Sequence, residues 1–241
     1  MRPFASGLLA SLLAAQSPAP QAADAGLQPY VAEYEVRYGN MTVGRSRTEL
    51  DRAGQTGHWV IESQSTASGF ARLIAGGTLK QRSTFELSGA SLRPTSYSFD
   101  DGTKRTARDV TLEFDWLAGR VRGVAEGEPV DVQSVPGLQD AASIQAFVQS
   151  RLANGEEPGT VPMIEKDRIK HYRHTLLRRE RLATAIGEYD TVVYRSARDK
   201  SDREIVTWYA PALGFAAVQA EQRSDGKRAF QTYIRSYQPG R

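Results

Sequence analysis

The sequence predicts an all-β protein, mostly antiparallel, in which a strongly curved sheet forms a half-open or closed barrel with one packed α-helix. Two observations lead to this fold class. About a dozen segments with period-two alternation follow one another at spacings of about ten residues, and only residues 140–152 show helical spacing. Such a series is typical of antiparallel sandwiches and barrels, and a sheet of this size tends to curl. We expect the helix to lie against or across the concave face.

Two hairpins are the clearest local features. Residues 30–38 alternate tyrosine and small apolar residues with charged ones, and Gly39-Asn40 is a two-residue turn into a strand over 41–50. Near the C-terminus, Ser224-Asp225-Gly226-Lys227 joins two alternating runs and supplies residue types that accept a positive φ. Each hairpin is expected to bury one face and to keep the other in water.

The other alternating segments predict the remaining strands. We expect them at residues 58–67, 79–87, 95–99, 105–115, near Val121 and Val130, and at 160–164, 168–177, 180–184, 189–197 and 203–209. The apolar stretch between Gly69 and Gly77 interrupts this series. It is interpreted either as a plug in the core or as a lid over the mouth of a pocket.

The helix over residues 140–152 has recognisable ends. Asp140 is a suitable N-cap, and Asn154-Gly155 ends the helix. Between them, Ile144, Phe147, Val148 and Leu152 fall on one face. This apolar stripe is expected to lie on the sheet.

The N-terminus has the pattern of a cleaved signal peptide. A basic residue precedes a short apolar run, and Ala23-Asp24-Ala25 fits the small-x-small cleavage rule. We therefore predict a signal peptide over residues 1–25, a single β-rich domain over 26–241, and a periplasmic location. The sequence contains no cysteine, so neither lipidation at a signal-peptide cysteine nor a thiolate metal site is expected. No stable membrane insertion is predicted.

The charge balance excludes one class of partner. Lys and Arg number 31 and Asp and Glu 28, which gives a net charge of +3. Nucleic-acid binding needs a concentrated basic face rather than this slight excess, so no nucleic acid is expected. The chain is expected to be a monomer.

No residue cluster identifies a reaction. A Gly-x-Ser-x-Gly elbow, a phosphate-binding glycine loop and convergent carboxylates are all missing from the sequence. His171 and His174 are three residues apart, which on a strand places them on opposite faces, where they do not readily share a metal ion. The protein is therefore predicted not to be an enzyme and to use no metal or cofactor.

Aromatic residues in one phase of their strands are the candidate ligand-binding residues. If the barrel is filled, they are core; if it is partly empty, they line a pocket in which tyrosine hydroxyls orient an amphiphile. The candidates are Tyr30, Tyr34, Tyr38, Trp59, Phe85, Phe114, Trp208 and Phe230.

One segment, residues 166–181, carries a local excess of positive charge. It is either a solvated strand face that discourages edge pairing or a surface for anionic headgroups or an acidic partner. The basic candidates are Lys166, Arg168, Lys170, Arg173, Arg178, Arg179 and Arg181.

Several short motifs in a fixed order resemble the exported bacterial family called domain of unknown function 3108. They are Ala32-Glu33-Tyr34 with Val43-Gly44, Leu92-Arg93-Pro94-x-x-Tyr97, Phe114-Asp115-Trp116, Gly137-Leu138-Gln139-Asp140, Leu182-x-Thr184-x-x-Gly187, and Trp208-Tyr209-Ala210-Pro211 with Gly226. The resemblance covers residues 27–238. It also implies, by analogy of fold, a similarity to periplasmic lipoprotein-carrier half-barrels that hold lipid in a concave sheet.

Two functions follow as hypotheses. The first is a periplasmic protein that binds or carries a hydrophobic or amphiphilic molecule of the cell envelope, with a lipid as the expected partner. The alternative is a non-enzymatic assembly or structural factor that binds another envelope protein through an edge strand or its basic face.

Overall fold

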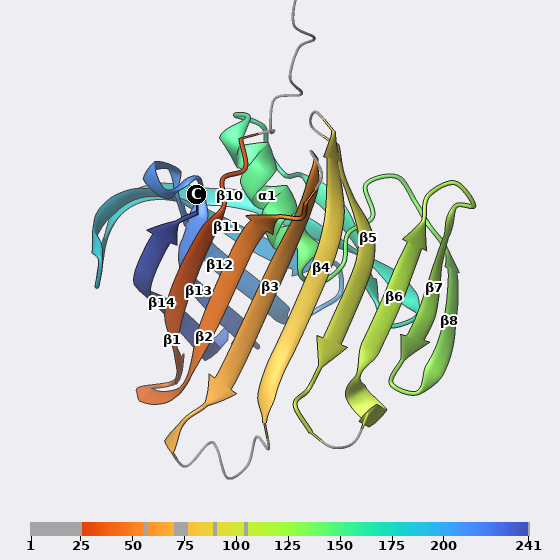
Figure 1. Ribbon diagram of the computed structural model, residues 1–241. Helices are drawn as coiled ribbons and strands as arrows, with labels where there is room; N and C mark the ends of the chain where they lie inside the picture. The colour runs from red at the N-terminus through yellow and green to blue at the C-terminus, as the bar shows by residue number, and fades with distance from the viewer. Residues whose placement is uncertain (1–25, 55–56, 70–76, 89–90, 104–105, 241) are drawn as a thin grey trace, which may run out of the picture.

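Fourteen strands form one antiparallel sheet in the computed structural model, which describes residues 26–54, 57–69, 77–88, 91–103 and 106–240 (Figure 1). The prediction of a mostly antiparallel, strongly curved sheet with one α-helix is confirmed. The strands are β1 (Tyr30–Tyr38), β2 (Met41–Arg52), β3 (His58–Ala67), β4 (Thr78–Ser88), β5 (Ser91–Asp100), β6 (Val110–Asp115), β7 (Arg120–Ala125), β8 (Glu128–Gln133), β9 (Thr160–Glu165), β10 (Arg168–Thr184), β11 (Gly187–Arg198), β12 (Arg203–Ala210), β13 (Ala216–Ser224) and β14 (Lys227–Pro239).

The first and last strands pair in the middle of the sheet. The strand order is β8-β7-β6-β5-β4-β3-β2-β1-β14-β13-β12-β11-β10-β9, so two meanders are joined by the pairing of β1 with β14. Short connections between neighbours produce each meander, because antiparallel strands can be joined by tight turns. The long-range β1–β14 pairing then makes the two meanders one sheet.

Both predicted hairpin turns are present. Gly39 has a φ of 57° between β1 and β2, and Asp225 and Gly226 have φ values of 51° and 70° between β13 and β14. Two successive positive φ values match a type I′ turn, whose twist suits paired strands.

The prediction of a break between residues 177 and 180 is wrong. Residues 168–177 and 180–184 were expected as two strands, but β10 runs through both as one strand of 17 residues. An irregularity between Leu176 and Arg178 shifts the register against β11. A bulge of this kind changes which residues face inward without ending the strand, and the sequence pattern alone looks like a break.

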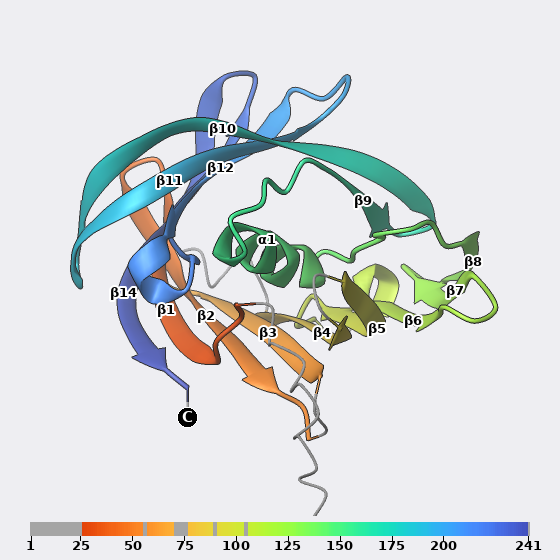
Figure 2. The same ribbon diagram turned by 90° about the horizontal axis from the view of Figure 1, so that it is seen from above.

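The sheet curves around the helix α1 (Ser143–Ala153) but does not close (Figure 2). Its edge strands β8 and β9 lie at the two ends of the strand order, and the intervening chain bridges them. Gln139 forms a parallel bridge with Met163, and the Lys166 ammonium lies 2.6 Å from a carboxylate oxygen of Glu126. The outcome is the half-open form of the predicted barrel.

The edge strand β8 is poorly suited to pairing with another chain. Glu128, Pro129 and Asp131 are exposed along it, and proline and charged residues commonly protect the edges of sheets from pairing.

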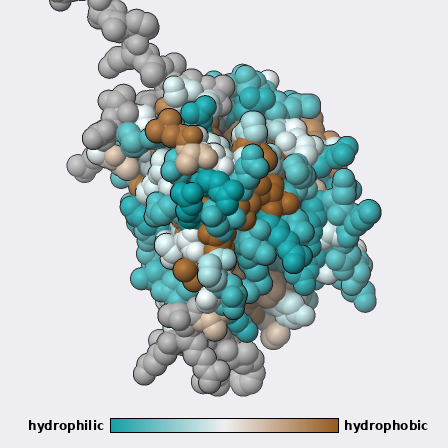
Figure 3. All heavy atoms as spheres, turned by 90° about the vertical axis from the view of Figure 1, so that its right-hand side faces the viewer, coloured by the Kyte–Doolittle hydropathy of each residue, from teal (hydrophilic) through white to brown (hydrophobic). Residues whose placement is uncertain are grey.

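Figure 3 views the side of the molecule that lies to the right in Figure 1. On this face, apolar residues are gathered between hydrophilic ones.

Asp140, the predicted N-cap, holds the turn that leads into the helix, whereas α1 begins at Ser143 and the residue at its N-cap position is Ala142. The Oδ1 atom of Asp140 accepts hydrogen bonds of 2.8 Å from the backbone N–H groups of Ala142 and Ser143. Its Oδ2 atom accepts a bond of 2.6 Å from the Ser83 hydroxyl on β4. One carboxylate therefore fixes the start of the helix and ties it to the sheet.

The helix buries polar residues as well as part of its predicted apolar stripe: Val148 and Leu152 are buried, whereas Ile144 and Phe147 are partly exposed. Gln149 is fully buried, and its side-chain N–H donates to the Tyr30 hydroxyl over 2.9 Å, with Gln145 donating to the same hydroxyl over 3.2 Å. The curved sheet surrounds the helix, so its polar side also meets protein. Amide side chains that find a hydroxyl partner can occupy such positions.

The segment between Gly69 and Gly77, expected as a plug or a lid, lies largely outside the described residues, as do residues 1–25. Within the described part of the chain, no helix has the length and apolar character needed to cross a bilayer.

Candidate functional site

A cavity of about 400 Å³ lies on the concave side of the sheet, beside the N-terminal half of α1. Strands from both meanders and the helix residues Ile144 and Val148 line it. No Asp, Glu, Lys or Arg is among the lining residues. Small side chains from β2, β12, β13 and β14 keep it open: Ser46, Thr48, Thr207, Ala217, Ala220 and Thr232.

A second cavity, of about 670 Å³, shares β1, β2 and β14 with the first and is otherwise lined by β3, β4 and β5. Unlike the first, it has charged residues in its lining: Arg45, Asp101 and Arg108. Ser46 of the first cavity and Ser65 of the second are register partners, and their hydroxyl oxygens are 3.0 Å apart. Val36 of the second cavity and Thr232 of the first are also paired. The two cavities are therefore adjacent parts of one concave surface, which we call the groove.

The outer part of the groove is mostly apolar and ends in exposed aromatic residues. Val36, Leu79 and Phe99 contribute to its wall. Tyr38 and Phe230 are 52% and 44% exposed, and their ring centroids are 5.3 Å apart. Apolar rings exposed beside an apolar cavity are typical of a binding surface.

Most polar atoms around the inner cavity already have partners. The Tyr34 hydroxyl donates to the carbonyl oxygen of Ala217 over 2.9 Å, and the Tyr172 hydroxyl donates to the Glu165 carboxylate. Burial raises the pKa of Tyr34 well above its usual range. These tyrosines therefore stay protonated and bonded to the protein at neutral pH.

His174 differs from these tyrosines. Its Nε2 atom is buried and has no hydrogen-bond partner among the described residues. Burial lowers the pKa of His174 to about 4, so its imidazole is neutral at pH 7. Among the residues that line the inner cavity, His174 thus combines an uncharged imidazole with a buried nitrogen that has no partner.

The predicted aromatic residues divide into groups. Tyr34 lines the inner cavity, and Tyr38 and Phe230 line the outer one. The remaining five are buried in the core and line neither cavity: Tyr30, Trp59, Phe85, Phe114 and Trp208. Trp208 apart, sequence phase alone could not separate core residues from groove residues, because both occupy the same face of their strands.

Trp208 is the candidate whose direction differs from the prediction. Its neighbours Thr207 and Tyr209 line the inner cavity, and successive side chains on a strand point to opposite faces. Its indole N–H donates to Glu180, and the Arg178 guanidinium lies 5.6 Å from its ring centroid. Trp208 is thus covered from outside by β10 rather than facing the groove.

The basic candidates on and near β10 are partly neutralised. Lys166 pairs with Glu126, Arg168 with Asp167 at 3.7 Å, Arg178 with Glu180 at 2.9 Å, and Arg181 with Glu188 at 3.0 Å. For the other three, Lys170, Arg173 and Arg179, the described residues offer no ion pair. The positive charge of this strand is therefore smaller than its sequence suggests.

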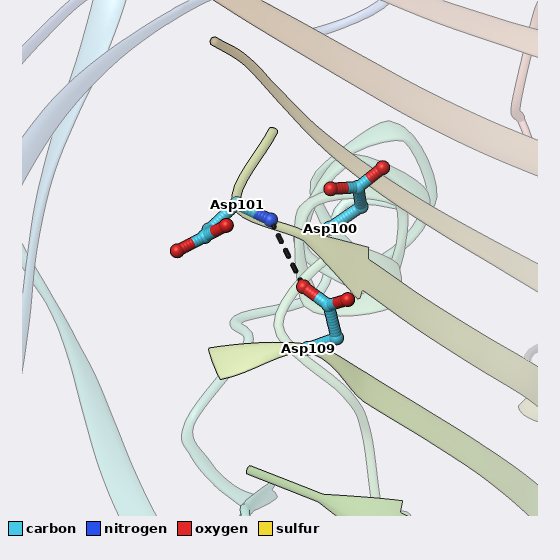
Figure 4. Close-up of side chains that lie close together, drawn as sticks. All are labelled: Asp100, Asp101 and Asp109. Carbon is cyan, nitrogen blue, oxygen red and sulfur yellow. Dashed lines mark hydrogen bonds between the residues drawn. The ribbon is translucent and has the colours of Figure 1, made fainter. Parts of the chain in front are cut away.

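An acidic cluster lies where β5 ends and β6 begins (Figure 4). Oxygen atoms of Asp100, Asp101 and Asp109 lie within 4.8 Å of one another. The carboxylates also accept backbone N–H groups, including that of Asp101 by Asp109 at 3.3 Å and that of Gly102 by Asp100 at 2.7 Å. Figure 4 shows the side chain of Asp101 pointing away from the other two. The cluster is explained by the turn that it stabilises.

Sequence reasoning missed two features of the groove. It treated His174 only as a possible metal ligand, and it gave no weight to the small residues of β12–β14. The alternation of the strands could have placed these residues on the inward face, because Tyr172 and His174 share one strand phase, as do Thr207 and Tyr209. What the sequence lacks is any mark that these phases face an unfilled space.

One solved structure supports the fold. A crystal structure of a β-barrel-like protein of domain of unknown function DUF1849 from Brucella abortus aligns with a TM-score of 0.58 at 8% identity, covering 89% of this chain and 98% of that one. A candidate exported protein with a YmcC-like fold from Bacteroides fragilis aligns with a TM-score of 0.39 at 11% identity, covering 88% and 96%. A candidate lipoprotein from Parabacteroides distasonis gives 0.36 at 10%, with the same coverages.

The sequence itself points to one family. No curated protein matches the chain. The model of the family described as protein of unknown function (DUF3108) matches residues 33–229, a range that runs from β1 to the start of β14 and includes the groove-lining residues except Phe230 and Thr232. The resemblance seen in the motifs is confirmed, and the chain belongs to the DUF3108 family.

Proposed function

We propose that this protein binds and carries a hydrophobic or amphiphilic molecule of the cell envelope in the groove. The observation that carries the proposal is the inner cavity of about 400 Å³ without a charged lining residue, which lies next to an outer cavity of about 670 Å³. Both volumes fall in the range of about 300–1,000 Å³ that is usual for small-molecule sites. The signal sequence predicted for residues 1–25 supports export to the periplasm, where such molecules occur.

The chemistry of the walls favours an elongated apolar ligand. Burial of apolar area stabilises a complex by roughly 25 cal/mol per Å², and the groove offers Ile144, Val148, Val36, Leu79 and Phe99 for this contact. An ionic group inside the inner cavity would lose its hydration and find no opposite charge there. A charged headgroup is therefore expected to remain outside the inner cavity.

The test starts with the mature protein purified gently from a bacterial periplasm. Native mass spectrometry is expected to show a discrete added mass, and organic extraction should recover that mass as a lipid or another amphiphile. If the protein keeps its apo mass even after incubation with total envelope lipid, the carrier proposal is wrong. That result would favour the alternative of a factor that binds another envelope protein.

A matched pair of variants links the bound mass to the groove. Ala220 lines the inner cavity between Thr207 and Thr232, so Ala220→Phe should fill it and abolish the added mass. Ala118 is exposed in the turn before β7, so Ala118→Phe adds the same side chain far from the groove and should leave binding unchanged. Equal retention of ligand by both variants would place the ligand elsewhere.

A further inference from the structure

Four exposed apolar side chains form one row across the strands at one end of the groove. Ile205 of β12 is in register with Gln222 of β13, and Gln222 is in register with Phe230 of β14. The row continues from Phe230 to Tyr38 of β1 and from Tyr38 to Met41 of β2. Register partners on neighbouring strands point to the same face of a sheet. We call Ile205, Phe230, Tyr38 and Met41 the lip.

The lip gathers most of the large apolar residues that the described part of the chain exposes. Phe230 is 44% exposed, Ile205 45%, Tyr38 52% and Met41 66%, and together they are four of the seven such residues. Single exposed apolar residues are common on soluble proteins, but a contiguous group marks a surface that a partner covers.

The lip borders both cavities of the groove. Ile205 lines the inner cavity, and Tyr38 and Phe230 line the outer one. A hydrocarbon chain that leaves either cavity past the lip therefore meets apolar side chains. A ligand of the proposed class is dissolved in a membrane, and exposing its chain to water is unfavourable. This continuity favours a lipid bilayer as the partner over a second protein.

The charges beside the lip are balanced. The β1–β2 turn, Gly39-Asn40, is uncharged. The β11–β12 and β13–β14 turns, each with the residue that follows it, carry three acidic and three basic residues: Asp199, Lys200, Asp202, Arg203, Asp225 and Lys227. Adsorption to anionic lipids needs an excess of basic residues. The contact is therefore apolar, and the amphipathic ring of Tyr38 suits the boundary between water and hydrocarbon.

We propose that the lip docks this protein onto the surface of a lipid bilayer, so that an apolar ligand passes between the membrane and the groove without crossing water. This inference rests on the proposed function and names the partner from which the groove is filled. Because the contact is apolar, docking occurs on bilayers without net charge and is insensitive to salt, which screens charge interactions only.

The experiment places a fluorescent label in the lip. The sequence contains no cysteine, so Met41→Cys supplies a single thiol for a nitrobenzoxadiazole label, whose emission shifts to the blue in an apolar medium. The labelled mature protein is mixed with phosphatidylcholine vesicles, and the blue shift is expected at low and at high salt. Leu117→Cys is the matched control, because Leu117 is fully exposed in the β6–β7 turn. The same shift at both positions, or at neither, would overturn the inference.

A second pair of variants measures the contribution of the lip to binding. In vesicle flotation, Met41→Gln should lower the fraction of bound protein about threefold to tenfold, as expected when one partly buried apolar side chain is lost. Leu117→Gln should bind like the wild type. Binding that requires phosphatidylglycerol and disappears at high salt would assign the contact to basic residues such as those of β10 and contradict the lip.

The remaining outcomes separate this inference from the carrier proposal. A blue shift at Met41→Cys that grows with protein concentration without vesicles would assign the lip to a second copy of the chain and overturn the docking. Wild-type protein that retains a bound lipid mass while the label at Met41→Cys stays in water would contradict the docking alone. Docking by a protein that never carries a bound mass would count against the carrier proposal instead.

Discussion

The concave side of this sheet has a packed region and an open region, although both are built from strands with the same alternation. In the packed region, large residues face one another across strands: Trp59 is paired with Phe85, and Phe114 with Val121. All four are at most 7% exposed. In the groove, by contrast, Thr207, Ala220 and Thr232 form a row across three neighbouring strands.

The size of the inward-facing residues explains this difference. Protein interiors pack to crystal-like density when side chains are large enough to meet. A row of threonine and alanine leaves space next to the sheet. The single helix α1 inside the curved sheet does not fill that space. Alternation thus specifies which residues face inward, and side-chain volume specifies whether the interior is core or cavity.

The chain between β8 and α1 adds to the contrast. Leu138, Gln139 and Asp140 are fully buried, and the Gln139 side-chain N–H donates to the carbonyl oxygen of Leu92 over 3.1 Å. This segment lies against β4 and β5 and fills that side of the interior. On the other side, α1 packs against β12 through Val148, Leu152 and Tyr209, and the groove beside this contact remains open.

The largest expected effect comes from opening the packed region. Phe85→Ala removes a side chain that is 1% exposed and should lower the free energy of unfolding by about 3–5 kcal/mol. Met163→Ala at the wall of the groove borders existing space, so its expected cost is about 2 kcal/mol or less. Urea unfolding of both variants measures the difference, and equal losses would mean that the groove is packed like the core.

Asp140 gives the second effect, in the connection between helix and sheet. Asp140→Ala leaves the Ser83 hydroxyl and two backbone N–H groups without their buried acceptor, and it should cost about 2–3 kcal/mol. Asp140→Asn keeps one carbonyl oxygen for the N–H groups and should cost less. Thermal unfolding distinguishes the two, and a harmless Asp140→Ala would contradict the role assigned to the cap.

The local features of the fold could be predicted from sequence because their causes are local. Gly39 and Asp225-Gly226 supply the positive φ values of the two hairpin turns, and Asp140 supplies acceptors for the helix start. The bulge in β10 was not predictable, since its register shift arises from pairing with β11. A pattern change within one strand and a gap between two strands look alike in sequence.

The groove was harder to predict for a related reason. Tyr30 and Tyr38 share one phase of β1, yet the first is 2% exposed and the second 52%. Their difference depends on α1 and Tyr237 lying over Tyr30, contacts made by residues more than a hundred positions away. Candidate residues could be placed on a face, but the packing of the other elements decides which of them border the groove.

The smallest expected effect concerns pH, because the two regions respond in opposite directions. For His174 the folded pKa is about 4, below the usual 6.5, so between these values the unfolded chain binds more protons and stability falls as the pH falls. For Asp140 in the packed region, burial raises the pKa from 3.8 to about 6. Between those values the folded protein binds more protons, and stability rises as the pH falls.

Two variants separate these contributions. His174→Phe should make stability fall less steeply than in the wild type from pH 6.5 to pH 4, and Asp140→Asn should make it fall more steeply. Each change is limited to about 1.4 kcal/mol per pH unit, the slope for one proton, and it is smaller for His174 because that side chain is partly exposed to water in the groove. Urea unfolding at several pH values measures the slopes. If both variants show the same dependence of unfolding free energy on pH as the wild type, the two groups do not titrate as their surroundings require. The filled and open regions would then not differ in their response to pH.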